Sequence, residues 1–499
     1  MSTHAEVATS TPPADEPAPY RWRWAALFVI LAAEVMDLLD AMVTNIAGPT
    51  IRTDIGGSAS TLQWLGAAYT LAMTTGLLTG GRLGDIFGRK RMFVIGAAGF
   101  VVGSLLCAVA QSPETLIAAR VVQGLFGAVM LPQGLGMIKE MFPPKEMQSA
   151  FVLFGPVMGL ASVGGPILAG WLVDADFFGT GWRMIFIINL PFGLAAILGA
   201  LRFLPESRSP HALKLDLPGV VIASLAAVLI VFPLVQGRES DWPVWSFIMI
   251  GASVVTFALF GWFEARKSRA GGDPLIVPSL FRKRAFTGGL LTGVVFFSGM
   301  AGFMLVFNLY TQIGLGYSPI KAGLAGVPWS VGMILGMGIM QTVKRFGRKV
   351  LHGGALIMAL GALGVYLTID MAGIGVTPWQ LAPALIVTGI GMGLLMGPFF
   401  DIVLAGVEQH ETGSASGTLT AVQQLGNAFG VALLGTIFFD LLGPVPTGTT
   451  FEHAMKITLW VVAGMLLLTF LVAFLLPKYA REEDAPEGDA PKEVVSAST

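Results

Sequence analysis

The sequence predicts an all-α polytopic membrane protein with about fourteen transmembrane helices. Of its 499 residues, 54% are hydrophobic and only 12% are charged, whereas a soluble protein carries about a quarter charged residues. Long apolar runs recur along the chain, and each reaches the roughly 20 residues that a helix needs to cross the hydrocarbon core. An outer-membrane barrel would show alternating segments of about ten residues, which this sequence does not contain.

The distribution of basic residues supports this helix count independently. With the N-terminus placed inside, 24 of the 30 Lys and Arg residues fall in cytoplasmic segments, as the positive-inside rule requires. An even number of spans with both termini in the cytoplasm therefore fits best. The first 20 residues lack the basic-then-apolar order of a cleavable signal, so the first helix is expected to act as the membrane signal. The expected spans are 24–47, 61–80, 92–110, 115–138, 149–173, 183–204, 217–236, 243–264, 285–309, 319–341, 350–369, 379–404, 413–439 and 454–476.

A weak internal repeat divides the chain. Gly88-Arg89-Lys90 recurs 259 residues later as Gly347-Arg348-Lys349. Repeated halves related by pseudosymmetry are typical of secondary transporters, which build a central site between the halves. The predicted parts are a disordered cytoplasmic tail (1–20), an N-terminal six-helix bundle (21–204), two additional helices with their linkers (205–284), a C-terminal six-helix bundle (285–476) and a disordered cytoplasmic tail (477–499).

Three acidic residues in the first predicted helix are the strongest functional signal. Glu34, Asp37 and Asp40 are spaced three apart, so they form a slanted stripe on one side of the helix. A carboxylate in the membrane is costly and normally faces a bundle interior or a watery cavity. Arg120 in the fourth helix is at a similar depth and is the expected partner of Asp40. The stripe favours proton coupling by Glu34, Asp37, Asp40 and Arg120, and the alternative is an ion pair that only locks the packing.

Two further motifs indicate conformational roles. The segment after the second helix contains Asp85, Gly88 and Arg89, in which small residues allow close helix contact and the basic residue anchors the loop. The fifth helix contains Gly165-Pro166 and Gly170, a combination that bends or loosens a helix. These six residues are the predicted gating set, and the alternative for the fifth helix is a purely structural kink.

Neutral polar and aromatic side chains within spans are candidates for a substrate cavity. Trp64 has the alternative of anchoring its helix at the membrane interface. The candidates are Asn45, Trp64, Tyr69, Gln123, Asn308, Tyr310, Gln424 and Asn427.

Together these motifs resemble the major facilitator superfamily, and within it the fourteen-helix drug:proton antiporters. The resemblance covers residues 24–476 and implies a major facilitator fold of two six-helix bundles plus two additional central helices. It implies export across the bacterial cytoplasmic membrane by alternating access in exchange for protons. The expected substrates are small amphipathic organic compounds, and the acidic stripe favours cations among them. The residues that carry it are Leu39-Asp40, Asn45-Ile46-Ala47, Asp85, Gly88, Arg89, Arg120, Gly124, Gly165-Pro166, Gly170, Trp182-Arg183 and Asn189-Leu190-Pro191.

Other function classes find little support. The chain contains no Gly-Lys dipeptide, and so lacks the usual phosphate-binding loop, and its five histidines show no metal-ligand spacing. We therefore expect no enzymatic activity, metal, cofactor or nucleic-acid partner. The expected partners are a small-molecule substrate, protons and the lipid bilayer, with the proton gradient as energy source and a monomeric chain. A channel, or a transporter that imports or exports one specific metabolite on the same fold, remains an alternative.

Overall fold

The computed structural model describes most of the chain. The described residues are 20–143, 146, 153, 157, 161, 164–208, 214–404, 407, 412–443 and 445–478. Most of the two predicted tails and residues 149–152 of the predicted fifth helix lie outside the described residues, as do most of the positions from 154 to 163. The side chain of Asn45, a predicted cavity residue, also lies outside them.

The described part of the chain is helical throughout, in agreement with the predicted all-α class. In the N-terminal half the elements are α1 (Arg23–Ile55), α2 (Ala59–Phe87), α3 (Arg89–Ala108), α4 (Pro113–Met141), a helical stretch at 164–174, η1 (Phe177–Gly179), η2 (Gly181–Arg183), α6 (Met184–Ile187) and α7 (Asn189–Phe203). The middle of the chain forms α8 (Leu217–Gln236), η3 (Arg238–Ser240), α9 (Val244–Arg269) and η4 (Pro278–Arg282). The C-terminal half comprises α10 (Arg284–Leu309), the π-helical turn η5 (Tyr310–Gly314), α11 (Pro319–Val343), η6 (Lys344–Phe346), α12 (Arg348–Ala372), η7 (Gly373–Gly375), α13 (Pro378–Val403), α14 (Thr412–Leu442), α15 (Gly448–Val472) and η8 (Ala473–Leu475).

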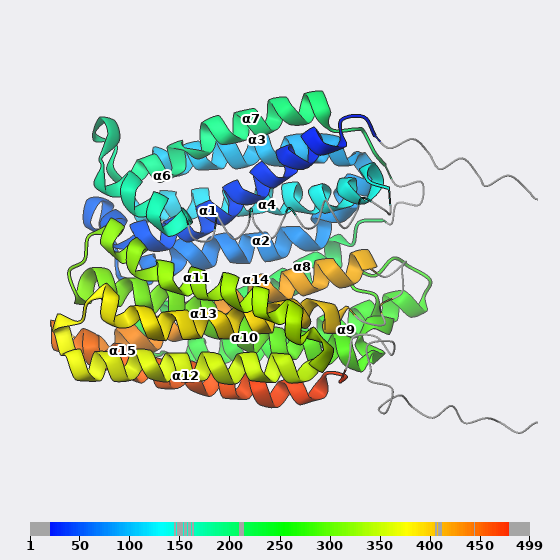
Figure 1. The fold of residues 1–499 in the computed structure, drawn as a ribbon. Coiled ribbons are helices and arrows are strands. Elements are labelled where there is room, and N and C mark those ends of the chain that lie inside the picture. The colour runs from blue at the N-terminus through cyan, green and yellow to red at the C-terminus, as the bar shows by residue number, and fades with distance from the viewer. Residues whose placement is uncertain are drawn as a thin grey trace, which may run out of the picture.

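Eleven helices in the described ranges are long and apolar enough to cross a membrane. They comprise α3, α4, the 181–203 segment and the eight long helices from α8 to α15. Neither α1 nor α2 is among the eleven, and α1 carries the three acidic residues of the predicted stripe. Both nevertheless run alongside the others, because α1 packs on α7 and α2 packs on α4 (Figure 1).

The helices lie roughly parallel in two groups, with the N-terminal helices above the C-terminal helices in Figure 1. We call the end at which α1 begins and α15 finishes the terminal end, and the opposite end the far end. In the C-terminal group, α10 packs between α14 and α15, and α13 packs between α11 and α12. The pair α8 and α9 packs together, and α8 also contacts α2 and α14. Helix α8 therefore contacts both the N-terminal and the C-terminal half.

The sequence repeat corresponds to a repeated turn. Gly88 joins α2 to α3 as a single residue with φ 104°, and Gly347 precedes α12 with φ 54°. Positive φ strains a residue that carries a Cβ, so glycine suits both turns. The shared Gly-Arg-Lys sequence thus places a glycine with positive φ directly before a helix in each half.

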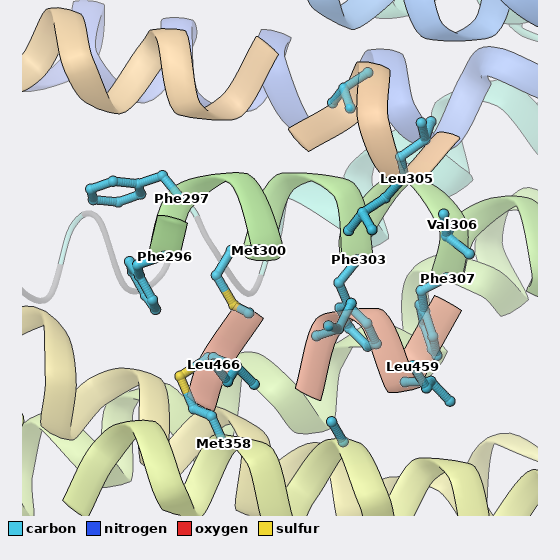
Figure 2. Close-up of a cluster of buried hydrophobic side chains, with 14 of the residues drawn as sticks. Phe296, Phe297, Met300, Phe303, Leu305, Val306, Phe307, Met358, Leu459 and Leu466 are labelled. Atoms are coloured by element: carbon cyan, nitrogen blue, oxygen red, sulfur yellow. The ribbon is translucent and has the colours of Figure 1, made fainter. Parts of the chain in front are cut away.

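The largest apolar core lies in the C-terminal half. Figure 2 shows Phe296, Met300 and Phe303 of α10 facing Met358 of α12 and Leu466 of α15, all of them buried. Neighbouring rings make edge contacts, such as Phe296 and Phe297 at 5.1 Å between centroids. Because lipid chains are as apolar as these side chains, close van der Waals packing is what holds such helices together in a membrane.

Several polar contacts tie the two halves together at the far end. Gln63 of α2 donates to the Ala432 carbonyl at 3.0 Å and to Thr436 Oγ1 at 3.3 Å, both on α14. Gln312 of η5 donates to the Ile46 carbonyl of α1 at 2.8 Å. The Ile320 amide of α11 donates to Asp174 Oδ2 at 3.0 Å.

The 164–174 stretch approaches α11 closely at the same end. A Cβ on Gly170 would lie 2.4 Å from Ile320 Cα, and a Cβ on Gly323 would lie 2.2 Å from the Pro166 carbonyl oxygen. These distances are far below van der Waals contact with backbone atoms, which cannot rotate away. Gly170 is therefore required for this contact.

We predict that Gly170→Ala destabilises the protein by about 1–3 kcal/mol, the usual cost of an overpacked contact. Gly164 lies on the same stretch, and a Cβ there would meet nothing within 4 Å, so Gly164→Ala is the matched control. Thermal unfolding of both variants in the same detergent is the measurement. Equal midpoints for the two variants would contradict the prediction.

Candidate functional site

The three acids of the predicted stripe all lie on α1, but their surroundings differ. Asp40 is only 2% exposed, whereas Glu34 and Asp37 are half-buried. Asp40 is one turn nearer the far end than Asp37. The stripe therefore passes from a partly open environment into the closed interior of the N-terminal half.

Asp40 forms a buried ion pair with Arg120 of α4, as the sequence predicted. Arg120 is 1% exposed and donates through Nη1 to Asp40 Oδ2. It also donates through Nη1 to Gln123 Oε1 at 2.7 Å and through Nε to the Leu65 carbonyl oxygen of α2 at 3.2 Å. One guanidinium thus connects α1, α2 and its own helix.

Two amides and a hydroxyl complete this ion-pair network, by which we mean Asp40, Ser104, Arg120, Gln123 and Asn189. Gln123 Nε2 and Asn189 Nδ2 both donate to Asp40 Oδ1 at 2.8 Å. The same two nitrogens reach Ser104 Oγ, at 2.8 and 3.2 Å respectively. The network spans α1, α3, α4 and α7, and every side chain in it is buried.

Sequence reasoning did not select Ser104 or Asn189 as site residues. Asn189 stood in a recognised motif, Asn189-Leu190-Pro191, and a polar amide near the start of an apolar run was its only other signal. Ser104 is one small hydroxyl in the apolar α3, where serine is common as a packing residue in membrane helices. Its contact with Gln123 depends on how α3 and α4 are packed, which no local pattern reveals.

Tyr69 of α2 links the ion-pair network to the second acid of the stripe. Its hydroxyl donates to Asp37 Oδ1, and its ring centroid lies 4.2 Å from Arg120 Cζ. A Cβ on Gly127 of α4 would lie 3.4 Å from both the Tyr69 hydroxyl and Asp37 Oδ1, so a larger side chain there would crowd this pair. A cation over an aromatic face is itself stabilised when water is excluded.

The three acids of α1 differ in how many hydrogen-bond donors surround them, and therefore in how easily each can accept a proton. The two oxygens of Asp40 accept hydrogen bonds from Arg120, Gln123 and Asn189, so a proton on Asp40 would have to displace a donor. Asp37 accepts from one neutral hydroxyl, and Glu34 forms no hydrogen bond or ion pair with the described residues. In this conformation, Asp37 and Glu34 therefore have fewer hydrogen-bond donors to displace on taking up a proton than Asp40 has.

A small apolar cavity of about 250 Å³ borders the ion-pair network. Its walls come from one side of α1, from Leu168 and Leu172, and from α6 and α7. Asp40 and Asn189 are the polar residues that line it.

The other predicted cavity residues are dispersed. Gln424 of α14 donates to Met73 Sδ of α2 at 2.9 Å, and Asn427 donates to Gln424 Oε1 at 2.9 Å. Gln424 therefore contacts the N-terminal half, and Asn427 is hydrogen-bonded to Gln424. Tyr69 and Gln123 belong to the hydrogen-bonded groups around Asp37 and Asp40 described above.

Three candidates have other surroundings in this structure. The ring of Trp64 packs against the ring of Phe232 of α8, with 5.9 Å between the ring centroids. Asn308 Nδ2 donates to the carbonyl oxygen of Met304 in its own helix at 2.9 Å. Tyr310 is fully buried at the start of the π-helical turn η5. Their contribution to a substrate cavity stays a prediction.

The predicted gating residues after α2 pack within the N-terminal half. Arg89 donates to Asp85 Oδ1 at 2.9 Å and pairs with Glu140 Oε1 of α4 at 2.9 Å. Its amide donates to the Ser207 carbonyl oxygen at 2.9 Å. Gly88 provides the positive-φ turn, and in the helical stretch 164–174 Gly165 is buried beside Pro166, whose carbonyl faces Gly323.

Among the described residues no group of three or more His, Cys, Asp or Glu side chains is arranged to hold a metal ion. The single cysteine, Cys107, is buried and its Sγ lies 3.7 Å from Gln123 Oε1.

A buried ion pair inside a bundle of membrane-spanning helices, with a sequence repeat relating two halves, is the arrangement expected of a secondary transporter. Residues 30–431 match the model of the Major Facilitator Superfamily. The chain belongs to this superfamily, whose members are membrane transporters and not enzymes.

The sequence of this chain is similar to those of several curated relatives over most of their length. The chain is 53% identical over 443 residues to the "Probable actinorhodin transporter" of Streptomyces coelicolor, covering 88% of this chain and 76% of that protein. It is 34% identical to "Puromycin resistance protein pur8" of Streptomyces alboniger, covering 91% of each. It is 30% identical to "Multidrug efflux pump LfrA" of Mycolicibacterium smegmatis, covering 86% of this chain and 84% of that protein.

Solved structures share the fold at low sequence identity. A POT family transporter in complex with 5-aminolevulinic acid matches with a TM-score of 0.65 and 14% identity, over 91% of this chain and 96% of that one. The D-xylose-proton symporter matches with a TM-score of 0.63 and 16% identity, over 92% and 98%. These matches establish the fold alone.

We predict that Asp40→Asn lowers the free energy of unfolding by about 3–5 kcal/mol, because removing one partner leaves the buried Arg120 charge uncompensated. Asp370→Asn is the control: Asp370 pairs with Lys456 at 2.8 Å with its side chain 49% exposed, and an exposed pair contributes about 0–1 kcal/mol. Denaturant titration of both variants in mixed micelles gives the comparison. A loss for Asp40→Asn no greater than that for Asp370→Asn would show that the pair is not structural.

Proposed function

We propose that this transporter is a proton-coupled antiporter that exports small amphipathic organic compounds across the cytoplasmic membrane by alternating access. The observation that carries the proposal is the arrangement of α1, in which a satisfied ion pair at Asp40 lies one turn from the half-buried Asp37 and two turns from Glu34. Acids within a membrane bundle that are not fully paired are typical of proton relays.

The proton step is assigned to the stripe on α1. Asp37 and Glu34 take up the proton in this conformation, and Asp40 with Arg120 fixes α1 against α4 while they do so. A proton on Asp37 would change its bond with Tyr69, whose ring lies on Arg120. Through Tyr69, protonation and the packing of α1, α2 and α4 are coupled. Movement of Arg120 would bring Asp40 into the same relay.

The direction and substrate class rest on the relatives. Their names describe an actinorhodin transporter, puromycin resistance and a multidrug efflux pump. We extend export of antibiotics or other drugs to this chain, with organic cations included because the stripe is acidic. The half-buried Gln424 and Asn427 of α14, next to Met73, supply hydrogen bonds and an adaptable apolar contact for such compounds.

We further propose the fourteen-helix topology of the drug:proton antiporters for this chain. The eleven candidate spans, α1, α2 and the helix that contains 164–174 make up this number. Both termini then lie in the cytoplasm of a bacterial cell, and the terminal end of the structure is the cytoplasmic end. The proton gradient is the energy source, no cofactor takes part, and the working unit is a monomer.

Apart from the Gln424–Met73 contact near the middle of α2, the polar contacts between the halves described above are at the far end, which is the outer end in this topology. We therefore assign the structure to a conformation that is closed on the outside. In the reverse conformation the Asp85–Arg89 segment would meet the C-terminal half, and the contact of Gly170 and Pro166 with α11 would open. The gating roles of Asp85, Gly88, Arg89, Gly165, Pro166 and Gly170 follow from this cycle.

For the transport test, the protein is reconstituted in proteoliposomes and a pH gradient is imposed. Actinorhodin, puromycin and a cationic dye are offered, and substrate movement is expected only against the proton flow. We predict that Asp37→Asn and Glu34→Gln each reduce gradient-driven transport at least tenfold while the protein remains folded. Asp370→Asn, which removes an exposed partner of Lys456 at 2.8 Å, is the control and is expected to transport normally.

Undiminished antiport in both α1 variants would refute the proton assignment. Movement of substrate in the same direction as protons would instead support the alternative of an importer. A response to one compound of the panel only would support a transporter of one specific compound.

The topology is tested separately by cysteine labelling in intact cells, with Cys107 replaced by alanine. Phe178 is 95% exposed at the far end, and a cysteine there is predicted to react with an impermeant maleimide added outside. A cysteine in place of the exposed Arg269, at the end of α9, is predicted to react only after the membrane is permeabilised. The opposite pattern would reverse the orientation proposed here.

A further inference from the structure

A second cluster of ionisable side chains lies far from α1, at the terminal end of the α8–α9 pair. Asp216 precedes α8, and its Oδ1 accepts a hydrogen bond from the Gly219 amide at 3.0 Å. Glu264 of α9 accepts a hydrogen bond from the Ile276 amide at 3.1 Å through Oε2. Both acids are buried, with Asp216 0% and Glu264 4% exposed.

The remaining oxygens of these two acids face each other. A Cβ on Gly219 would lie 2.5 Å from Glu264 Oε1 and 2.8 Å from Asp216 Oδ2, so both oxygens border the same point. Glu264 Oε1 is buried and has no hydrogen-bond partner in the described part of the chain. Two ionised carboxylates cannot share such a site, because like charges at this range disfavour each other. A proton between the two oxygens would satisfy both.

The surrounding charges indicate which acid carries the proton. Lys267 Nζ lies 3.0 Å from Asp216 Oδ2. Burial opposes the charge on Asp216, but the Gly219 amide and Lys267 outweigh it and hold the pKa of Asp216 below its usual value. Asp216 is thus the ionised partner, and Glu264 is the partner that holds the proton.

The charge balance of the cluster agrees with one bound proton. The facing cations are Lys267 of α9 and Arg82 of α2, and the facing anions are Asp216 and Asp273. Asp85 also faces Arg82 but is paired with Arg89. With Glu264 neutral the two cations and two anions balance, and an ionised Glu264 would add an uncompensated buried charge.

Arg82 connects this cluster to the segment that follows α2. Its guanidinium donates to the carbonyl oxygens of Lys214 at 2.8 Å and of Leu275 at 3.3 Å, and to that of Pro274. Residues 273–276 are thus bound from two sides, by Arg82 through their carbonyls and by Glu264 through the Ile276 amide. Displacing Glu264 would therefore disturb the carbonyls that hold Arg82.

We propose that Asp216 and Glu264 form a proton-binding site at the terminal end of the additional helix pair, and that the bound proton keeps Arg82, and with it the end of α2, attached to the α9–α10 linker. When the proton is lost, the two ionised carboxylates repel each other. Glu264 then breaks its hydrogen bond with the Ile276 amide, and the hydrogen bonds of Arg82 to the linker carbonyls are broken in turn. This site is separate from the acids of α1 and responds to pH on the side of the membrane that the terminal end faces. The proposal does not depend on the substrate or on the direction of transport.

The test uses the full-length chain in lipid nanodiscs with Cys107 replaced by alanine. Spin labels are placed at Phe87→Cys and Arg269→Cys, two exposed positions at the ends of α2 and α9, and distances are measured by double electron–electron resonance over a pH series. We expect a single short distance at low pH that becomes broad and longer as pH rises. Glu264→Gln, which cannot ionise, is expected to keep the short distance throughout. Glu452→Gln, which alters a glutamate paired with Lys456 at the far end, is the control and should behave as the parent.

A second readout detects the proton itself. The infrared band of a protonated carboxylic acid is expected to lose intensity in Glu264→Gln. The same band is expected to keep its intensity in Glu452→Gln. Arg82→Lys is expected to retain the Glu264 band and yet to show the long, broad distance at low pH. Lysine lacks the planar fork by which Arg82 reaches the Lys214 carbonyl through Nη1 and the Pro274 and Leu275 carbonyls through Nη2. A distance in the parent protein that does not change with pH, or a Glu264→Gln protein that responds like the parent, would overturn the proposal.

Discussion

The cost of placing charge inside a membrane bundle is the constraint on which the N-terminal half depends. Arg120 cannot lose its proton at physiological pH, so its charge must be compensated wherever the helices place it. Asp40 supplies the opposite charge, and Gln123, Asn189 and Ser104 supply the remaining hydrogen bonds. Four helices are therefore positioned by one guanidinium and its partners. A shift of any of these helices would leave a buried polar group unsatisfied, at a cost of about 1–3 kcal/mol for each group.

The same cost of burying charge also gives the neighbouring acids Asp40 and Asp37 different roles. Asp40 and Asp37 lie one turn apart on α1, yet Asp40 accepts hydrogen bonds from three donors. Within the described part of the chain, Asp37 accepts one hydrogen bond, from the Tyr69 hydroxyl. The difference arises from the helices opposite, not from α1 itself. A carboxylate that is fully hydrogen-bonded contributes to rigidity, and one that is partly hydrogen-bonded is available for chemistry.

Much of the fold was readable from the sequence because its signals are long and local. Runs of apolar residues predicted the helices, and spacing along α1 and depth in the fourth helix predicted the pairing of Asp40 with Arg120. Prediction was weakest where partners come from distant segments. Ser104 and Asn189 join the ion-pair network through packing of α3 and α7, and Trp64 packs on Phe232 of the additional pair. Nothing in the local pattern around Asp216 or Glu264 indicates that 48 residues of chain return these two acids to one point.

The one-residue turn at Gly88 has a mechanical consequence. Because α2 ends at Phe87 and α3 begins at Arg89, a single residue connects them. Neither helix can therefore move along its axis unless the other moves with it. Glu206 Oε1 would lie 2.2 Å from a Cβ on Gly88, so the segment after α7 also closes over the turn. A force applied to the end of α2 is therefore delivered to α3, which carries Ser104 of the ion-pair network.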